Sequence, residues 1–294
     1  MERITIPSTV VEIGEFAFLY CRRLREVVLN DGLKKIGRGV FKDCKNLRNV
    51  VLNEGLKMIR NGTFQNCPSL ELITLPSTVN DVDQNAFYMC TSLREVVLND
   101  GLKTIKSNAF RDCSSLENIS MPSTVIEIEQ YAFRNCSNLR EVIIHNEGIH
   151  IRDESFLRCT SLERFKFPGL STRLDNIILA GQRDIESKMD DIPAIEWRGG
   201  ELVIPVIRRE IEEYIGSGIG MVEQATVVEV DNGKLNKVKG LITYYKKKEA
   251  TTLFELALWK FGIDQADNDD NIDRVAHRIE VPGPVKDTIL QYLR

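Results

Sequence analysis

The chain has 294 residues, 43% of them hydrophobic and 28% charged, which is typical of soluble folded proteins and excludes a disordered or collagen-like chain. The formal net charge of −4 at pH 7 argues against a nucleic-acid partner. No apolar run of about eighteen residues occurs, and no basic segment leads into an apolar one, so neither a membrane span nor a secretory signal is predicted. We therefore expect a cytoplasmic or otherwise intracellular protein, with a surface location as the alternative if the N-terminus is incomplete.

A repeat of 23 residues runs through the first part of the chain. Its markers are seven cysteines, each with a phenylalanine three positions before it and a leucine three positions after it. The cysteines are Cys21, Cys44, Cys67, Cys90, Cys113, Cys136 and Cys159. A fixed period of this length is typical of a solenoid, in which each repeat forms one small structural unit.

Each repeat contains a short strand, a turn and a compact second half. The strand has the pattern L-x-x-V-x-L, as in Leu24, Val27 and Leu29, whose alternation predicts one buried side. The turn contains either glycine, which tolerates positive φ, or proline, which ends the strand. The glycines are Gly32, Gly55 and Gly101, and the prolines are Pro7, Pro76 and Pro122. A buried Ile or Val follows, and then a helical turn that carries Phe and Cys inward.

The combined pattern, L-x-x-V-x-L followed by Pro or Asn and then I-x-x-x-A-F-x-x-C-x-x-L, closely resembles the BspA-type leucine-rich repeat. The resemblance covers about residues 1–169. It implies a right-handed solenoid with a parallel sheet on its inner face, and a role in protein binding rather than catalysis. Known members are mostly surface or adhesion-related proteins. A surface adhesion-type protein, with a signal or anchor outside this chain, is therefore the alternative function.

The spacing of the cysteines bears on metal and disulfide chemistry. A metal site needs clustered ligands, and no two cysteines are closer than 23 residues. Equivalent cysteines of stacked repeats have parallel Cβ vectors, which is the wrong geometry for a disulfide. We therefore predict a ladder of buried structural thiols, and no metal or other cofactor.

Two outward-facing columns of strand residues are the candidate binding surface. One column is apolar and β-branched, and the other is mostly acidic or amide. The candidate protein-binding residues are Glu26, Val28, Asn49, Val51, Thr74, Glu95, Val97, Glu141 and Ile143. Exposed apolar residues with a polar rim often mark a protein-binding site. Alternatively, the columns only reflect the preference of Val, Ile and Thr for strands.

After Pro168 the period stops, and residues 170–294 are predicted to form a mainly α-helical region. Helices are expected from a capping box at 172–175, over 205–215 and over 233–247. Two more are expected, from a capping box at 252–255 that opens the apolar LFELALWKF, and within 282–294. The polar loop 264–273 lacks the Gly and terminal Glu of a calcium hand. Part of this region is expected to cap the open end of the solenoid.

No enzymatic activity is predicted. The histidines are His145, His150 and His277, and no nucleophile elbow, P-loop or dinucleotide fingerprint occurs. The sequence therefore predicts a repeat protein that acts as an interaction scaffold, binding a protein through the sheet face, the helical region or both. Met1 falls in the column of Leu24, so the first repeat has no cap before it. We expect that further repeats precede it, or that a partner or a second copy covers it.

Overall fold

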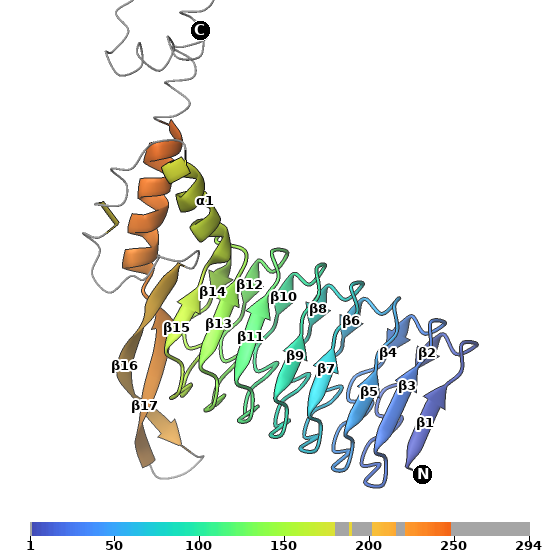
Figure 1. Cartoon of the computed structure of the whole chain (residues 1–294). Helices are drawn as coiled ribbons and strands as arrows, with labels where there is room; N and C mark the ends of the chain where they lie inside the picture. Colours follow the sequence, from blue (N-terminus) through green and yellow to red (C-terminus); the bar gives the residue numbers. More distant parts are fainter. Residues whose placement is uncertain (1, 180–187, 190–201, 216–220, 248–294) are drawn as a thin grey trace, which may run out of the picture. The chain divides into compact units, whose positions relative to one another are not determined.

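The computed structural model describes residues 2–179, 188–189, 202–215 and 221–247. Residues 1–172 and 192–235 form one compact unit, and residues 173–191 and 236–294 form another. The first unit contains the repeats, and each turn of the chain contributes one rung to a stack (Figure 1).

Eight parallel strands form the first wall of the stack, one from each rung. They are β1 (Arg3–Ile6), β3 (Glu26–Leu29), β5 (Asn49–Val51), β7 (Leu72–Thr74), β9 (Glu95–Val97), β11 (Asn118–Met121), β13 (Glu141–Ile144) and β15 (Arg164–Lys166). Paired residues are 23 positions apart, as in Arg3 with Glu26 and Glu26 with Asn49. The predicted parallel sheet with one strand per repeat is therefore confirmed.

Seven shorter parallel strands form the second wall. They are β2 (Glu12–Ile13), β4 (Lys35–Ile36), β6 (Met58–Ile59), β8 (Asp81–Val82), β10 (Thr104–Ile105), β12 (Glu127–Ile128) and β14 (His150–Ile151). The segments with phenylalanine and cysteine form hydrogen-bonded turns, as in the bond from Cys113 N to Phe110 O at 3.2 Å. The repeat is thus a β-solenoid turn with no true helix.

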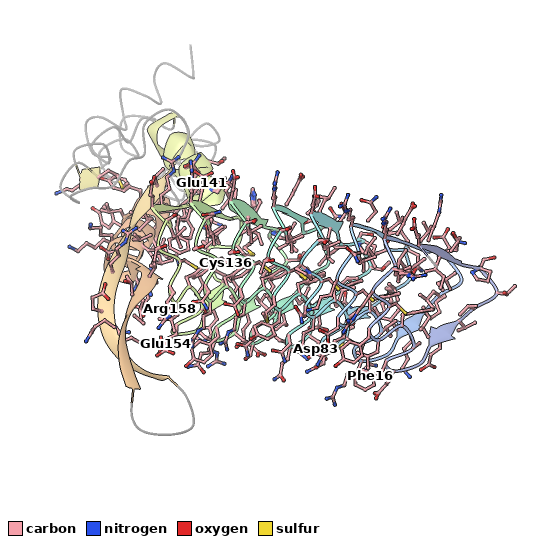
Figure 2. All side chains as sticks on the ribbon, turned by 90° about the horizontal axis from the view of Figure 1, so that it is seen from below. Phe16, Asp83, Cys136, Glu141, Glu154 and Arg158 are labelled. Carbon is pink, nitrogen blue, oxygen red and sulfur yellow. The ribbon has the colours of Figure 1, made fainter. Side chains whose placement is uncertain are left out.

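Two side-chain columns fill the space between the walls. The phenylalanine rings from Phe18 to Phe156 stack nearly parallel, with neighbouring centroids 5.1 to 5.5 Å apart. Each cysteine from Cys44 onward donates its thiol to the carbonyl of the phenylalanine 26 positions earlier, at 3.1 to 3.3 Å. All seven thiols are free, and all except the half-buried Cys21 are buried. In Figure 2, Cys136 lies between the walls, with Glu141 on the sheet side and Glu154 on the other.

The turn glycines have two different roles. Gly55 and Gly101 adopt φ values of 123° and 117°, which side-chain-bearing residues rarely adopt. Gly32 does not share this conformation. Its role is steric, because an added Cβ would collide with the carbonyl oxygen of Ser8 in the preceding rung.

A β-hairpin covers the last rung of the first unit. Its strands are β16 (Val203–Ile215) and β17 (Met221–Val230), and β16 pairs antiparallel with β15, placing Ile204 opposite Phe165. The Arg158 N–H donates to the Thr226 carbonyl at 2.7 Å, continuing a ladder of main-chain bonds that joins the phenylalanine and cysteine turns of successive rungs. Ile204 and Val227 are fully buried. The hairpin therefore bonds to the first wall and to the last phenylalanine and cysteine turn of the solenoid.

The prediction of a helix over 205–215 is wrong, because these residues belong to β16. Their apolar residues fit helical spacing, but residues 206–215 pair along their whole length with β17, which supplies main-chain partners that an isolated segment lacks. The covering element seen in this unit is thus a hairpin and not a helix.

Two helices are described after the repeats. α1 (Pro168–Leu179) begins before the predicted capping box, and Thr172 lies inside it, with its hydroxyl donating to the Pro168 carbonyl at 3.1 Å. The helix predicted over 233–247 is confirmed over 232–247, and the Asp231 carboxylate caps it by accepting from Lys234 N at 3.0 Å. The elements predicted at 252–255, 264–273 and 282–294 lie outside the described residues. The predicted boundary near residue 169 stays a prediction.

Candidate functional site

The outward face of the eight-stranded wall carries the predicted binding residues. Register places the acidic and amide residues in one column, which contains Arg3, Glu26, Asn49, Leu72, Glu95, Asn118, Glu141 and Arg164. The parallel column contains Thr5, Val28, Val51, Thr74, Val97, Ser120, Ile143 and Lys166. We call these two columns together the sheet face.

Exposed apolar side chains on the sheet face concentrate near its middle. Val51 is 52% exposed on β5, and Leu72 is 46% exposed on β7. Val28, Val97 and Ile143 are half-buried. Leu72 is absent from the predicted binding residues, although its column is otherwise charged or polar. That exception was the signal in the sequence that could have identified it.

The acidic residues of the sheet face are linked to neighbouring rungs. Glu26 pairs with Arg3 at 3.4 Å, and Glu141 pairs with Arg164 at 2.8 Å and Lys166 at 3.2 Å. The Arg3–Glu26 pair is largely exposed, and exposed ion pairs contribute about 0–1 kcal/mol each to stability. They set the charge pattern of the face more than they hold the stack together.

The hydrogen-bonded sheet is interrupted twice. Its segments are β1-β3-β5, then β7-β9, then β11-β13-β15-β16-β17. Both interruptions come directly before a rung whose strand leads into proline, at Pro76 after β7 and at Pro122 after β11. Proline has no N–H to donate to the preceding rung, which weakens pairing at that point. The candidate residues on β5 and β7 therefore face each other across an unpaired junction.

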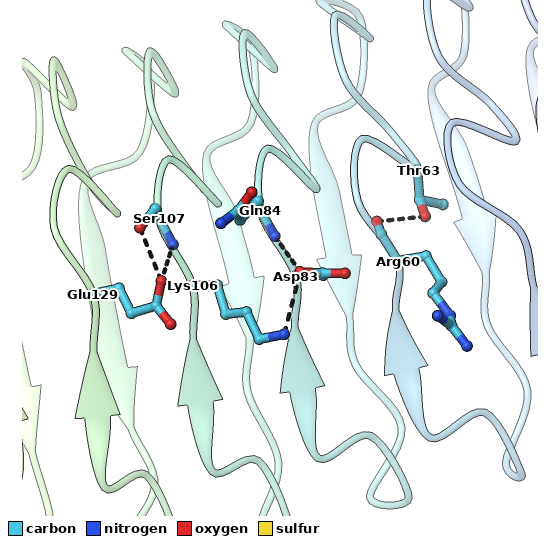
Figure 3. Close-up of polar contacts among 7 residues, drawn as sticks. All are labelled: Arg60, Thr63, Asp83, Gln84, Lys106, Ser107 and Glu129. Atoms are coloured by element: carbon cyan, nitrogen blue, oxygen red, sulfur yellow. Dashed lines mark hydrogen bonds and ion pairs between the residues drawn. The ribbon is translucent and has the colours of Figure 1, made fainter.

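The second wall uses its polar side chains to join rungs. Lys106 contacts Asp83 at 3.3 Å, and Glu129 accepts from Ser107 N at 2.9 Å and from its hydroxyl at 2.8 Å (Figure 3). The Thr63 hydroxyl instead bonds within its own rung, donating to the Arg60 carbonyl at 2.8 Å. Within the described residues, no group of three or more His, Cys, Asp or Glu side chains could hold a metal ion. This wall therefore shows structural contacts and no assembled reactive group.

The buried thiols of Cys44, Cys90 and Cys113 are poor nucleophiles. Burial raises the pKa of Cys44 and of Cys90 to about 12, and it raises the pKa of Cys113 well above the ordinary 9.0. A thiol must ionise to attack a substrate or bind a metal. His145 is exposed and lies 3.2 Å from the Ser120 hydroxyl on the open sheet face, while His277 lies outside the described residues.

No helix in the part of the chain that the structure describes is long and apolar enough to cross a membrane. The intracellular location stays a prediction.

Comparison with known proteins agrees with this architecture. A family model described as "BspA type Leucine rich repeat region (6 copies)" matches residues 1–84 and 57–186. A leucine-rich repeat protein from T. pallidum is 31% identical, with a TM-score of 0.51, and the match covers 54% of this chain and 77% of that one. No curated protein matches the chain.

Two further solved structures are more distant. A leucine-rich repeat protein from Eubacterium ventriosum is 24% identical, with a TM-score of 0.43, over 46% of this chain and 43% of that one. A leucine rich cell surface protein from Faecalibacterium prausnitzii is 19% identical, with a TM-score of 0.39, over 55% of this chain and 58% of that one. The match thus covers less than two thirds of the length of either protein.

Proposed function

The chain belongs to the BspA-type leucine-rich repeat family, and we propose that it is a non-catalytic scaffold that binds a partner protein on the sheet face. The observation that carries this proposal is the pair of exposed apolar side chains, Val51 and Leu72, on the neighbouring strands β5 and β7 of a sheet face with a polar rim. Covering a large apolar side chain contributes about 1.5–3 kcal/mol to association.

The rigidity of the solenoid supports this role. Strand pairing at 23-residue intervals and the stacked phenylalanine rings hold the backbone of the face in place before any partner arrives. A preorganised surface loses little conformational entropy on binding, so more of the contact energy appears as affinity. The buried thiols and phenylalanine rings lie inside the stack, which leaves the side chains of the sheet face for recognition.

A charge-insertion variant tests the proposal. Val51→Asp combined with Val97→Asp places two carboxylates on the sheet face without removing a fully buried side chain. We expect an unchanged circular dichroism spectrum and loss of partner capture in pull-down. Ile126→Asp is the matched control, because Ile126 is 55% exposed but lies outside the eight-stranded wall. Equal capture by the double variant and the wild type would exclude the sheet face as the binding surface.

A further inference from the structure

The junction between β5 and β7 is hollowed into a groove of about 550 Å³. Its floor contains Val50 and Leu52, which point inward but stay half-buried. The equivalent residues on β7, Ile73 and Leu75, are at most 1% exposed. The core is therefore open to solvent at this junction.

The walls of the groove are apolar as well. Val51 and Leu72 line it from the two sides, and they are among the most exposed large apolar residues of the described chain. The second sheet interruption, between β9 and β11, differs in two ways. Asn118 occupies the position equivalent to Leu72, and the inward residues Val96 and Leu98 are at most 9% exposed. The β5–β7 junction thus combines an open floor with apolar walls.

The charged residues that line the groove are both acidic. They are Glu26, which lies level with Asn49 in the register, and Glu54, which follows β5. Glu26 contacts Arg3 at 3.4 Å, and the Glu54 carboxylate accepts from Ser77 N at 3.3 Å and from its hydroxyl at 3.1 Å. Residues 49–54 span about 17 Å of extended chain. The groove therefore has an apolar centre with a carboxylate toward each end.

We propose that this groove binds an extended segment of the partner protein, in which an apolar residue is flanked two positions before and two positions after by Lys or Arg. The proposal rests on the proposed function of the sheet face. Alternate residues of an extended chain point to the same side, so the three side chains enter the groove together. The apolar one covers Val50, Val51 and Leu72, and the long basic ones reach Glu26 and Glu54.

Defined peptides test this specificity on the full chain. The probes are fluorescein-labelled GSKTLTKSG, the acid-flanked GSETLTESG and the centre-truncated GSKTATKSG, measured by fluorescence anisotropy. We expect GSKTLTKSG to bind at least about tenfold more tightly than either of the others. The acid-flanked peptide lacks the two charge pairs with the groove, and the centre-truncated peptide lacks the buried leucine.

Variants of the chain locate the binding. Leu72→Asn introduces the residue that already occupies this column at Asn49 and Asn118, so the fold is expected to persist while affinity for GSKTLTKSG falls about tenfold. Glu26→Gln with Glu54→Gln should remove the preference for basic flanks. Glu95→Gln is the matched control, because Glu95 lies in the same column but does not line the groove, and it should change nothing.

Several results would overturn the assignment. These are equal binding of the basic and acidic peptides, no binding of GSKTLTKSG up to millimolar concentration, or unchanged affinity in Leu72→Asn. Self-association that Leu72→Asn abolishes would assign the groove to a second copy of the chain instead. The proposed function fails separately, by unchanged partner capture in the Val51→Asp and Val97→Asp double variant.

Discussion

The buried cysteine ladder makes the stability of the protein sensitive to alkaline pH. Burial raises the pKa of Cys44 and Cys90 to about 12, and it raises the pKa of Cys67, Cys113 and Cys136 well above 9.0. The folded state therefore keeps protons that the unfolded chain releases above pH 9. The contribution of the protonated thiols to the free energy of unfolding is complete below pH 9, and it is lost as the pH rises toward the pKa values of the folded state.

The size of the effect follows from the number of thiols. Each buried thiol lowers the free energy of unfolding by about 1.4 kcal/mol per pH unit above its unfolded pKa. The five thiols together therefore lower it by about 7 kcal/mol per unit, which is comparable with the whole stability of a typical domain. We expect the protein to unfold cooperatively between about pH 10 and 11.

A pair of variants separates the thiols from other alkaline groups. Cys113→Ala should reduce the slope of unfolding free energy against pH by about 1.4 kcal/mol per unit. Val82→Ala, also at a fully buried position, should lower the free energy by about 2 kcal/mol at every pH and leave the slope unchanged. Urea unfolding followed by circular dichroism from pH 7.5 to 10.5 measures both. Identical slopes in Cys113→Ala and the wild type would refute the reasoning.

Two further predictions concern the core and its cover. Phe110→Ala removes a fully buried ring from the stack and should lower the free energy of unfolding, measured with urea, by about 3–5 kcal/mol. Phe16→Ala, at a residue that is 38% exposed, should lower it by less. Equal losses in the two variants would contradict a core role for the stack. Val227→Asp places a charge in the buried contact between the hairpin and the last rung, and it should lower the melting temperature by more than about 5 °C. Ile207→Asp, at a 44% exposed site on the same hairpin, should leave the melting temperature unchanged. A hairpin that is dispensable for the stack would show the same melting temperature in both variants.

Much of the repeat region could be predicted from spacing alone. When residues recur every 23 positions, equivalent residues of neighbouring rungs lie next to one another, so the stacking of Phe110 on Phe87 and Phe133 could be expected. The helix over 232–247 was also predictable, because its apolar spacing follows directly after the capping residue Asp231. These features depend on local pattern or on strict repetition.

Two features of the protein were decided only by the tertiary structure. The segment 205–215 has a pattern compatible with a helix, and it is a strand because residues 206–215 pair with β17, which lies later in the chain. Likewise, the sequence places Val51 and Leu72 in known columns but does not reveal a groove between them. The β9–β11 junction lacks main-chain pairing as the β5–β7 junction does, yet Val96 and Leu98 are at most 9% exposed whereas Val50 and Leu52 are half-buried. Sequence spacing determines which residues repeat, whereas the packing of side chains between neighbouring rungs determines which of them are left exposed.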